Sequence, residues 1–139
     1  MATINSYLSF SGNTEEAFNF YKSVFGGEFV GGIRRYGDMP NNQDMSEADK
    51  QKVMHVGLPI GPGNFLMGTD ILPSMGHSVT FGTNYYLSLS PESKAEATKL
   101  FNGLSSGGKV LSPLEDSFWG GYFGSFTDKF GGQWMVNYL

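Results

Sequence analysis

The chain contains no cysteine among its 139 residues. Disulfide bonds, thiolate nucleophiles and zinc-thiolate sites are therefore excluded, and any metal would need His, Asp or Glu as ligands. Histidine is also scarce, because the sequence has only His55 and His77. A two-His-one-carboxylate iron site would need both of them. Few residues are left for nucleophilic or metal-based chemistry.

Clustered positive charge and long apolar runs are missing as well. The net charge is −4, and the adjacent pair Arg34-Arg35 would point to opposite faces of a strand. Because a nucleic-acid surface needs clustered Lys and Arg, we expect no nucleic-acid partner. No run approaches the roughly 18 apolar residues of a membrane span, and the start lacks the features of a signal peptide. We expect a cytoplasmic protein without membrane contact.

What the sequence does contain is an internal repeat. It consists of three segments that return 79 to 81 residues later, Tyr7-Leu8-Ser9-Phe10 as Tyr86-Leu87-Ser88-Leu89, Glu16-Ala17-x-x-Phe20-Tyr21 as Glu96-Ala97-x-x-Leu100-Phe101, and Gly26-Gly27 as Gly107-Gly108. Repetition at half the chain length predicts two copies of one strand-helix-glycine module. Neither copy is large enough to close a core alone, so we expect one domain over 1–139.

Local patterns predict a βαβββ order in each module. Module one, about 2–70, has expected strands at 3–10, 28–36, 53–60 and 65–69, a surface loop at 37–51, and a helix with an Asn13/Glu16 capping box and the apolar stripe Ala17, Phe20, Tyr21, Val24 and Phe25. Residues 71–82 are the expected linker. Module two, about 83–139, has expected strands at 85–89, 109–114, 119–126 and 133–138, and a helix capped by Ser90 with Pro91 in its first turn.

Over essentially the whole chain, the order and spacing of these motifs resemble the vicinal-oxygen-chelate superfamily, which includes glyoxalase I, ring-cleaving dioxygenases and bleomycin-resistance proteins. The PhnB-like branch is the most similar part of it. The motifs that carry this resemblance are Tyr7-Leu8-Ser9-Phe10-Ser11-Gly12, Val53-Met54-His55-Val56, Leu66-Met67-Gly68-Thr69-Asp70, Ser117-Phe118-Trp119-Gly120 and Asp128-Lys129-Phe130-Gly131-Gly132-Gln133-Trp134. The resemblance implies an α+β fold in which two βαβββ modules form a curved eight-stranded cup with the helices outside.

In metal-using members of this superfamily, four ligands line the cup. By resemblance, the corresponding positions here are Ser6, Met67, Asn84 and Met135, and none of these is a usual divalent-metal ligand. A shift of two residues in either direction brings no His, Asp or Glu into any of the four positions. We therefore expect no bound metal and no cofactor.

The remaining candidate site residues follow from the alternation of side chains along a strand. If those four positions face the cup, then Leu8, Tyr86, Ser88, Gln133 and Asn137 share that face. The predicted ligand-binding set is Ser6, Met67, Asn84, Tyr86, Gln133, Met135, Asn137 and Asp70. Asp70, at a strand end, is alternatively a cap or turn former. A surface of aromatic and amide groups suits a small, largely uncharged organic molecule.

His55 is the candidate for general acid or base chemistry near neutral pH. Its direction depends on the hairpin register, and the expected register points it into the cup beside Thr69. A structural histidine is the alternative. Whether the chain is an enzyme therefore stays open between a metal-free binding protein and a metal-independent lyase or isomerase, in which His55 is the base and Asn84 or Asn137 polarises a carbonyl.

Two further expectations come from the resemblance. Related chains pair so that cups form across modules, which predicts a homodimer. Some PhnB-like members carry a quinone-methyltransferase label, but this sequence has no G-x-G-x-x-G between a strand and a helix to hold S-adenosylmethionine. We therefore expect no methyl transfer.

Overall fold

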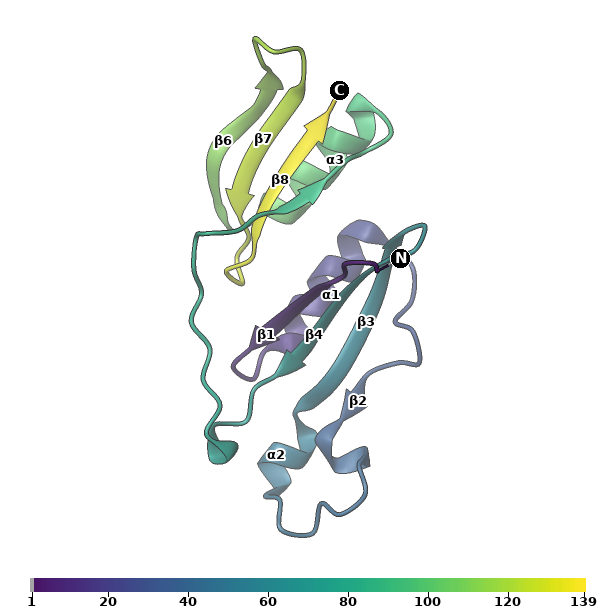
Figure 1. Ribbon diagram of the computed structural model, residues 1–139, viewed down its shortest axis with the longest axis vertical. Coiled ribbons are helices and arrows are strands. Elements are labelled where there is room, and N and C mark those ends of the chain that lie inside the picture. The colour runs from purple at the N-terminus through teal and green to yellow at the C-terminus, as the bar shows by residue number, and fades with distance from the viewer. Residues whose placement is uncertain (1) are drawn as a thin grey trace. The chain divides into compact units, whose positions relative to one another are not determined.

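The computed structural model describes residues 2–139 and contains two compact units, Met1–Thr80 (unit 1) and Phe81–Leu139 (unit 2). Each unit has one four-stranded mixed sheet with a long helix against one of its faces (Figure 1). The predicted α+β class and the two-module organisation are confirmed. We call the sheet face opposite the long helix the helix-free face of that unit.

Unit 1 follows the βαβββ order with three short helical additions. Its elements are β1 (Ser6–Phe10), α1 (Thr14–Phe25), β2 (Arg34–Arg35), η1 (Tyr36–Asp38), α2 (Glu47–Gln51), β3 (Val53–Gly61), β4 (Asn64–Asp70) and η2 (Pro73–Met75). The strand order in the sheet is β1-β4-β3-β2. The β1–β4 pair is parallel, whereas β3 is antiparallel to both of its neighbours.

The N-terminus of α1 differs from the expected capping box. Asn13 occupies the N-cap position but makes no capping hydrogen bond with its side chain. Instead, the backbone N–H of Thr14 donates to Asp70 Oδ1 at the end of β4, at 3.0 Å. The buried stripe is also shifted, because Phe18 rather than Phe20 lies in the core beside Tyr21. The start of α1 is therefore capped by Asp70, a residue of the sheet that is distant in sequence.

Two expected segments of unit 1 have different structures. The predicted strand at 28–36 is reduced to β2, because Gly31 and Gly32 both have φ of 71°, which interrupts extended backbone. The predicted loop at 37–51 contains η1 and α2. Helix α2 forms because Ser46 Oγ accepts a hydrogen bond from the backbone N–H of Asp49, which satisfies one of its free donors.

Unit 2 repeats the order with one long helix. Its elements are β5 (Leu87–Leu89), α3 (Lys94–Ser105), β6 (Lys109–Asp116), β7 (Tyr122–Thr127) and β8 (Gln133–Tyr138), and the sheet order is β5-β8-β7-β6. Helix α3 begins three residues later than a Ser90 cap would place it. Ser93 is the N-cap, since its Oγ accepts from the backbone N–H of Glu96 at 3.0 Å.

Each long helix packs directly over a glycine of its sheet. A Cβ on Gly68 of β4 would lie 2.4 Å from the Phe18 ring, and one on Gly124 of β7 would lie 2.6 Å from the Phe101 ring. These contacts leave no room for a side chain at either glycine. Both aromatic rings are buried in the cores of their units, so the glycines set how closely helix and sheet approach.

Candidate ligand-binding site

The register of β1 and β4 decides which side chains reach the helix-free face of unit 1. Tyr7 pairs with Met67, whereas Ser6 pairs with the fully buried Leu66, and partners in a parallel pair point to the same side. Tyr7 and Met67 therefore share the helix-free face. Ser6 points toward α1, so its expected direction was wrong by one residue. The resemblance placed Ser6 on the correct strand but on the wrong face of the sheet.

His55 lies on the helix-free face, as the hairpin register predicted. Gly57 of β3 pairs with Met67, and His55 is two residues along the same strand. The Tyr7 hydroxyl lies 3.1 Å from His55 Nδ1, and the two ring centroids are 5.7 Å apart. Tyr7 thus orients the imidazole of the one candidate acid or base.

The pKa of Tyr7 is raised above its ordinary value. Burial of the phenol is the main cause, the nearby Tyr36 adds to it, and a hydrogen bond with Thr69 acts in the opposite direction. The ordinary pKa of a tyrosine lies well above neutral pH, and the pKa of Tyr7 is raised further. Tyr7 therefore keeps its proton at neutral pH. A protonated phenol can donate to Nδ1 when His55 is in the tautomer that has its proton on Nε2.

Asp70 lies at the end of β4 with only 2% of its surface exposed. Its Oδ1 accepts from the backbone N–H groups of Gly12 and Thr14 and from Thr14 Oγ1, and its Oδ2 accepts from the backbone N–H of Val53. Both oxygens are thus engaged by donors of unit 1. This is the capping arrangement that the sequence left open, although the groups it caps belong to α1 and β3.

In unit 2, the expected alternation along β8 is present. Met135 pairs with Ser88 and Ser125, and Asn137 pairs with Phe123, so all of them share the helix-free face. The neighbours on β8, Trp134 and Val136, are fully buried on the α3 side. The face is thus lined by a thioether, an aromatic ring, an amide and hydroxyls.

The other predicted residues of unit 2 are more varied. Gln133 also belongs to the helix-free face, where it is buried and its side chain accepts a hydrogen bond from Thr127 Oγ1. Asn84 and Tyr86 lie before β5, because that strand begins only at Leu87, and both are exposed. The strand predicted at 85–89 therefore starts two residues later than expected, and neither Asn84 nor Tyr86 belongs to it.

Asn137 has an unusual oxygen. In residues 2–139, its Oδ1 is the single buried side-chain nitrogen or oxygen that has no hydrogen-bond partner. A Cβ on Gly121 would lie 2.9 Å from this oxygen and 2.0 Å from the Trp119 ring. The Trp119 ring in turn packs edge-on against Phe123, with centroids 6.1 Å apart. The Trp119 ring and this unpaired acceptor therefore both lie beside Gly121.

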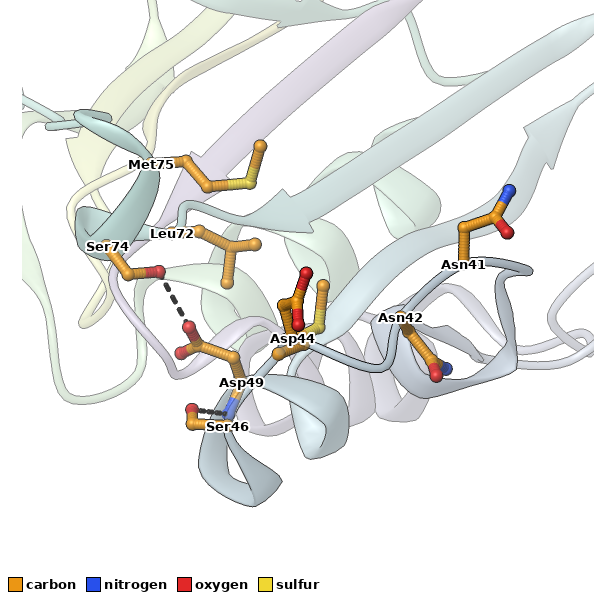
Figure 2. Close-up of a pocket in the computed structure, with 9 residues that line it drawn as sticks. Asn41, Asn42, Asp44, Ser46, Asp49, Leu72, Ser74 and Met75 are labelled. Atoms are coloured by element: carbon orange, nitrogen blue, oxygen red, sulfur yellow. Dashed lines mark hydrogen bonds between the residues drawn. The ribbon is translucent and has the colours of Figure 1, made fainter.

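A separate cavity of about 410 Å³ lies in unit 1 beside α2 and η2 (Figure 2). Its lining residues are Asn41, Asn42, Asp44, Met45, Ser46, Asp49, Leu72, Ser74 and Met75. Ser74 Oγ donates to Asp49 Oδ2 at 2.7 Å, and Lys52 Nζ lies 3.1 Å from Asp49 Oδ1. The Ser74 hydrogen bond, followed by Lys52, holds the pKa of Asp49 below its ordinary value.

Sequence reasoning missed this cavity because it placed residues 37–51 in a loop. The spacing of Ser46 and Asp49, three residues apart, is a helix N-cap signature and could have revealed α2. None of the predicted site residues lines the cavity. Its two carboxylates, without a lining Lys or Arg, make it chemically unlike the neutral helix-free faces.

In the part of the chain that the structure describes, no three His, Asp or Glu side chains are grouped so that they could hold a metal ion. No helix within residues 2–139 is long and apolar enough to cross a membrane.

A family model of the Glyoxalase/Bleomycin resistance protein/Dioxygenase superfamily matches residues 3–136. The chain belongs to this superfamily. Protein YjdN from Escherichia coli K12 is 31% identical over 142 residues, which cover 96% of this chain and 93% of YjdN. The resemblance inferred from the motifs is thus confirmed.

Solved structures of similar proteins agree with this assignment. Protein PA1353 from Pseudomonas aeruginosa has a TM-score of 0.84 and 40% identity, over 99% of this chain and 98% of that one. The PhnB protein from Bacillus cereus has a TM-score of 0.76 and 29% identity, over 99% of this chain and 100% of that one. Similarity to the PhnB-like branch is therefore also confirmed. Superfamily membership supports a role in binding a small molecule.

Proposed function

We propose that this protein binds a small, largely uncharged organic molecule on the helix-free faces of its sheets, without a catalytic metal. The observation that carries the proposal is the chemistry of the unit 2 face. On β8 and β7 it presents Met135, Asn137, Phe123 and Ser125, none of which carries a charge. Such a mixture of apolar surface and a few neutral hydrogen-bonding groups is typical of small-molecule sites.

Charged residues on these faces are confined to the edge strands. Lys109 and Glu115 of β6 pair with Thr127 and Phe123 and so lie on the unit 2 face at its edge. In unit 1, Arg34 pairs with His55 and lies on β2, which is an edge strand of that sheet. An ionic ligand would meet no fixed opposite charge on the central strands, and the loss of its hydration would be poorly compensated.

The proposed absence of a metal rests on residue identity. Met67 and Met135 stand at two of the positions that the resemblance assigns to metal ligands, and thioethers are poor ligands for zinc, nickel or iron(II) in such sites. Tyr7, which takes the direction expected for Ser6, engages His55 instead. Elemental analysis of the purified protein should therefore find well below one equivalent of these metals, and a stoichiometric amount would overturn this part.

Binding can be tested with three probes of matched size, namely acetophenone, benzoate and benzylammonium. Isothermal titration calorimetry should show that neutral acetophenone binds at least about tenfold more tightly than either ion, which is about 1.4 kcal/mol. Met135→Lys should abolish this binding because it places a charge on the unit 2 face. Met75→Lys, the matched control in the α2 cavity, should leave it unchanged. Loss of binding in the control alone would move the site to that cavity.

The contact between Tyr7 and His55 favours a second function, a metal-independent lyase or isomerase with His55 as general base. The two functions differ in what His55 does. In a binding protein, His55→Ala changes affinity only. In an enzyme, the same substitution leaves affinity unchanged and abolishes turnover. Tyr7→Phe should then shift the pH profile of turnover, since it removes the group that orients the imidazole.

The homodimer and the cytoplasmic location stay proposals that rest on the family resemblance and on the composition. Light scattering on the purified protein measures the first. A mass near 15.2 kDa, that of a single chain, would contradict it.

A further inference from the structure

The unpaired Asn137 oxygen indicates what kind of group a ligand must carry, and this inference rests on the proposed binding function. A carboxamide oxygen accepts hydrogen bonds and cannot donate them. Leaving such an acceptor buried without a partner is costly, and native proteins rarely do so unless a ligand or water fills the gap. A ligand with an O–H or N–H group would satisfy it, whereas a ligand with only acceptors would not.

The Trp119 ring occupies the place beside this oxygen. Ring and oxygen both lie against Gly121, where a Cβ would be 2.0 Å from the ring and 2.9 Å from Asn137 Oδ1. The ring also has an edge-to-face contact with Phe123, which pairs with Asn137 across β7 and β8. A flat aromatic group of a ligand in the same place could make the same edge-to-face contact with Phe123, because this packing is favourable for any aromatic ring.

Trp119 is held loosely enough to leave this place. Its side chain is 48% exposed, in contrast to Trp134, which is fully buried. It lies in the turn between β6 and β7, where the backbone is closed by the Ser117 N–H donating to the Gly121 carbonyl at 2.7 Å. Gly120, the next residue, has φ of 99°, so the turn is built without a side chain there. Outward rotation of the Trp119 side chain would give up its contacts with Gly121 and Phe123, which a ligand ring in the same place would replace.

We propose that Trp119 is a placeholder and that the place its ring takes beside Gly121 is a subsite for a planar, uncharged ring carrying an O–H or N–H donor. The ligand ring takes the position of the indole against Phe123. Its donor group gives the hydrogen bond that Asn137 Oδ1 lacks. Trp119 moves outward toward solvent.

Phenol and anisole separate this proposal from general binding of neutral molecules. They share one ring, but only phenol has an O–H donor. We expect phenol to bind the wild-type protein about five- to tenfold more tightly than anisole, which corresponds to about 1–1.4 kcal/mol. Asn137→Leu, which keeps the size of the side chain but removes the acceptor, should make the two affinities equal. The test compares the affinities of phenol and anisole for the same variant, so a modest loss of stability in Asn137→Leu does not affect the result.

Fluorescence excited at the tryptophan absorption edge reports the movement of Trp119. Phenol should shift the emission to longer wavelength as the indole enters water, against the constant signal of buried Trp134. Trp119→Phe is the matched control and should remove the shift while binding persists.

The outcomes distinguish this proposal from the one on which it rests. Equal binding of phenol and anisole to the wild type, or a preference that survives Asn137→Leu, would overturn the subsite and leave the binding function standing. A phenol complex without a spectral shift would overturn the placeholder role of Trp119. Failure of acetophenone, phenol and anisole alike to bind would overturn both proposals.

Discussion

Replacement of Asp70 by asparagine should destabilise unit 1 strongly. The buried carboxylate accepts four hydrogen bonds, three at Oδ1 from Gly12 and Thr14 and one at Oδ2 from the backbone N–H of Val53. In Asp70→Asn, an amide oxygen can still serve the first three. The amide nitrogen then meets the Val53 N–H, so two donors face each other in a buried site.

The magnitude follows from these bonds. A buried donor left without a partner costs about 1–3 kcal/mol, and a hydrogen bond to a charged group contributes about 1.5–3 kcal/mol, compared with about 0.5–1.5 kcal/mol for a neutral one. Because such contributions are not additive, we expect a total loss of about 3 kcal/mol. Urea unfolding at neutral pH measures it. Asp44→Asn, at an exposed carboxylate of the same unit, is the control and should change stability by less than about 0.5 kcal/mol.

A loss below about 1 kcal/mol for Asp70→Asn would refute this reasoning, because it would mean that the carboxylate contributes no more than a surface residue. The affinity of the protein for its ligand is not the readout. The prediction concerns the hydrogen bonds by which Asp70 of β4 holds the start of α1 and the start of β3. It is independent of any bound molecule.

Two other substitutions test packing and charge. Gly68→Ala should cost about 1–3 kcal/mol in urea unfolding, because its Cβ would lie 2.4 Å from the Phe18 ring. Gly57→Ala, whose nearest neighbours would be at 3.7 Å, is the control, and an equal loss in both would contradict the packing explanation. Ser74→Ala should raise the pKa of Asp49 toward its ordinary value of 3.8, as followed by the carboxyl carbon shift in an NMR titration, while Ser11→Ala should not. Because the pKa is lowered in the folded state, the Asp49 contribution to stability is present above 3.8 and is lost as the pH falls through the folded value. In Ser74→Ala this acid-dependent loss should become smaller, and an unchanged Asp49 titration would show that Ser74 has no such effect.

Features set by local pattern could be predicted from the sequence. The repeat gave the order of strands and helices in both modules, and alternation along β8 correctly grouped Met135 with Asn137. Alternation works there because Trp134 and Val136 are large and apolar, so one face of the strand is unambiguous. The direction of His55 followed from the hairpin for the same reason.

Features set by distant contacts could not be predicted. The cap of α1 comes from Asp70, 56 residues away from Thr14, so no local motif records it. Ser6 was assigned the wrong face because β1 is short and both of its faces contain hydrophobic residues, which leaves the register to its pairing with β4. The unpaired oxygen of Asn137 depends on the path of the turn around Gly121, which composition does not specify.

The glycines beneath the two long helices have a consequence for how this protein can change over time. At Gly68 and Gly124 the interior is filled by rings from the helices, Phe18 and Phe101, and not by the strands. Elsewhere on the central strands, residues that fill the interior alternate with residues of the helix-free face. Under the proposed function, substitutions at Met67 or Met135 would therefore alter ligand preference while the residues that determine folding stay the same. Under that proposal, single mutations on the helix-free faces would change specificity while the fold is kept.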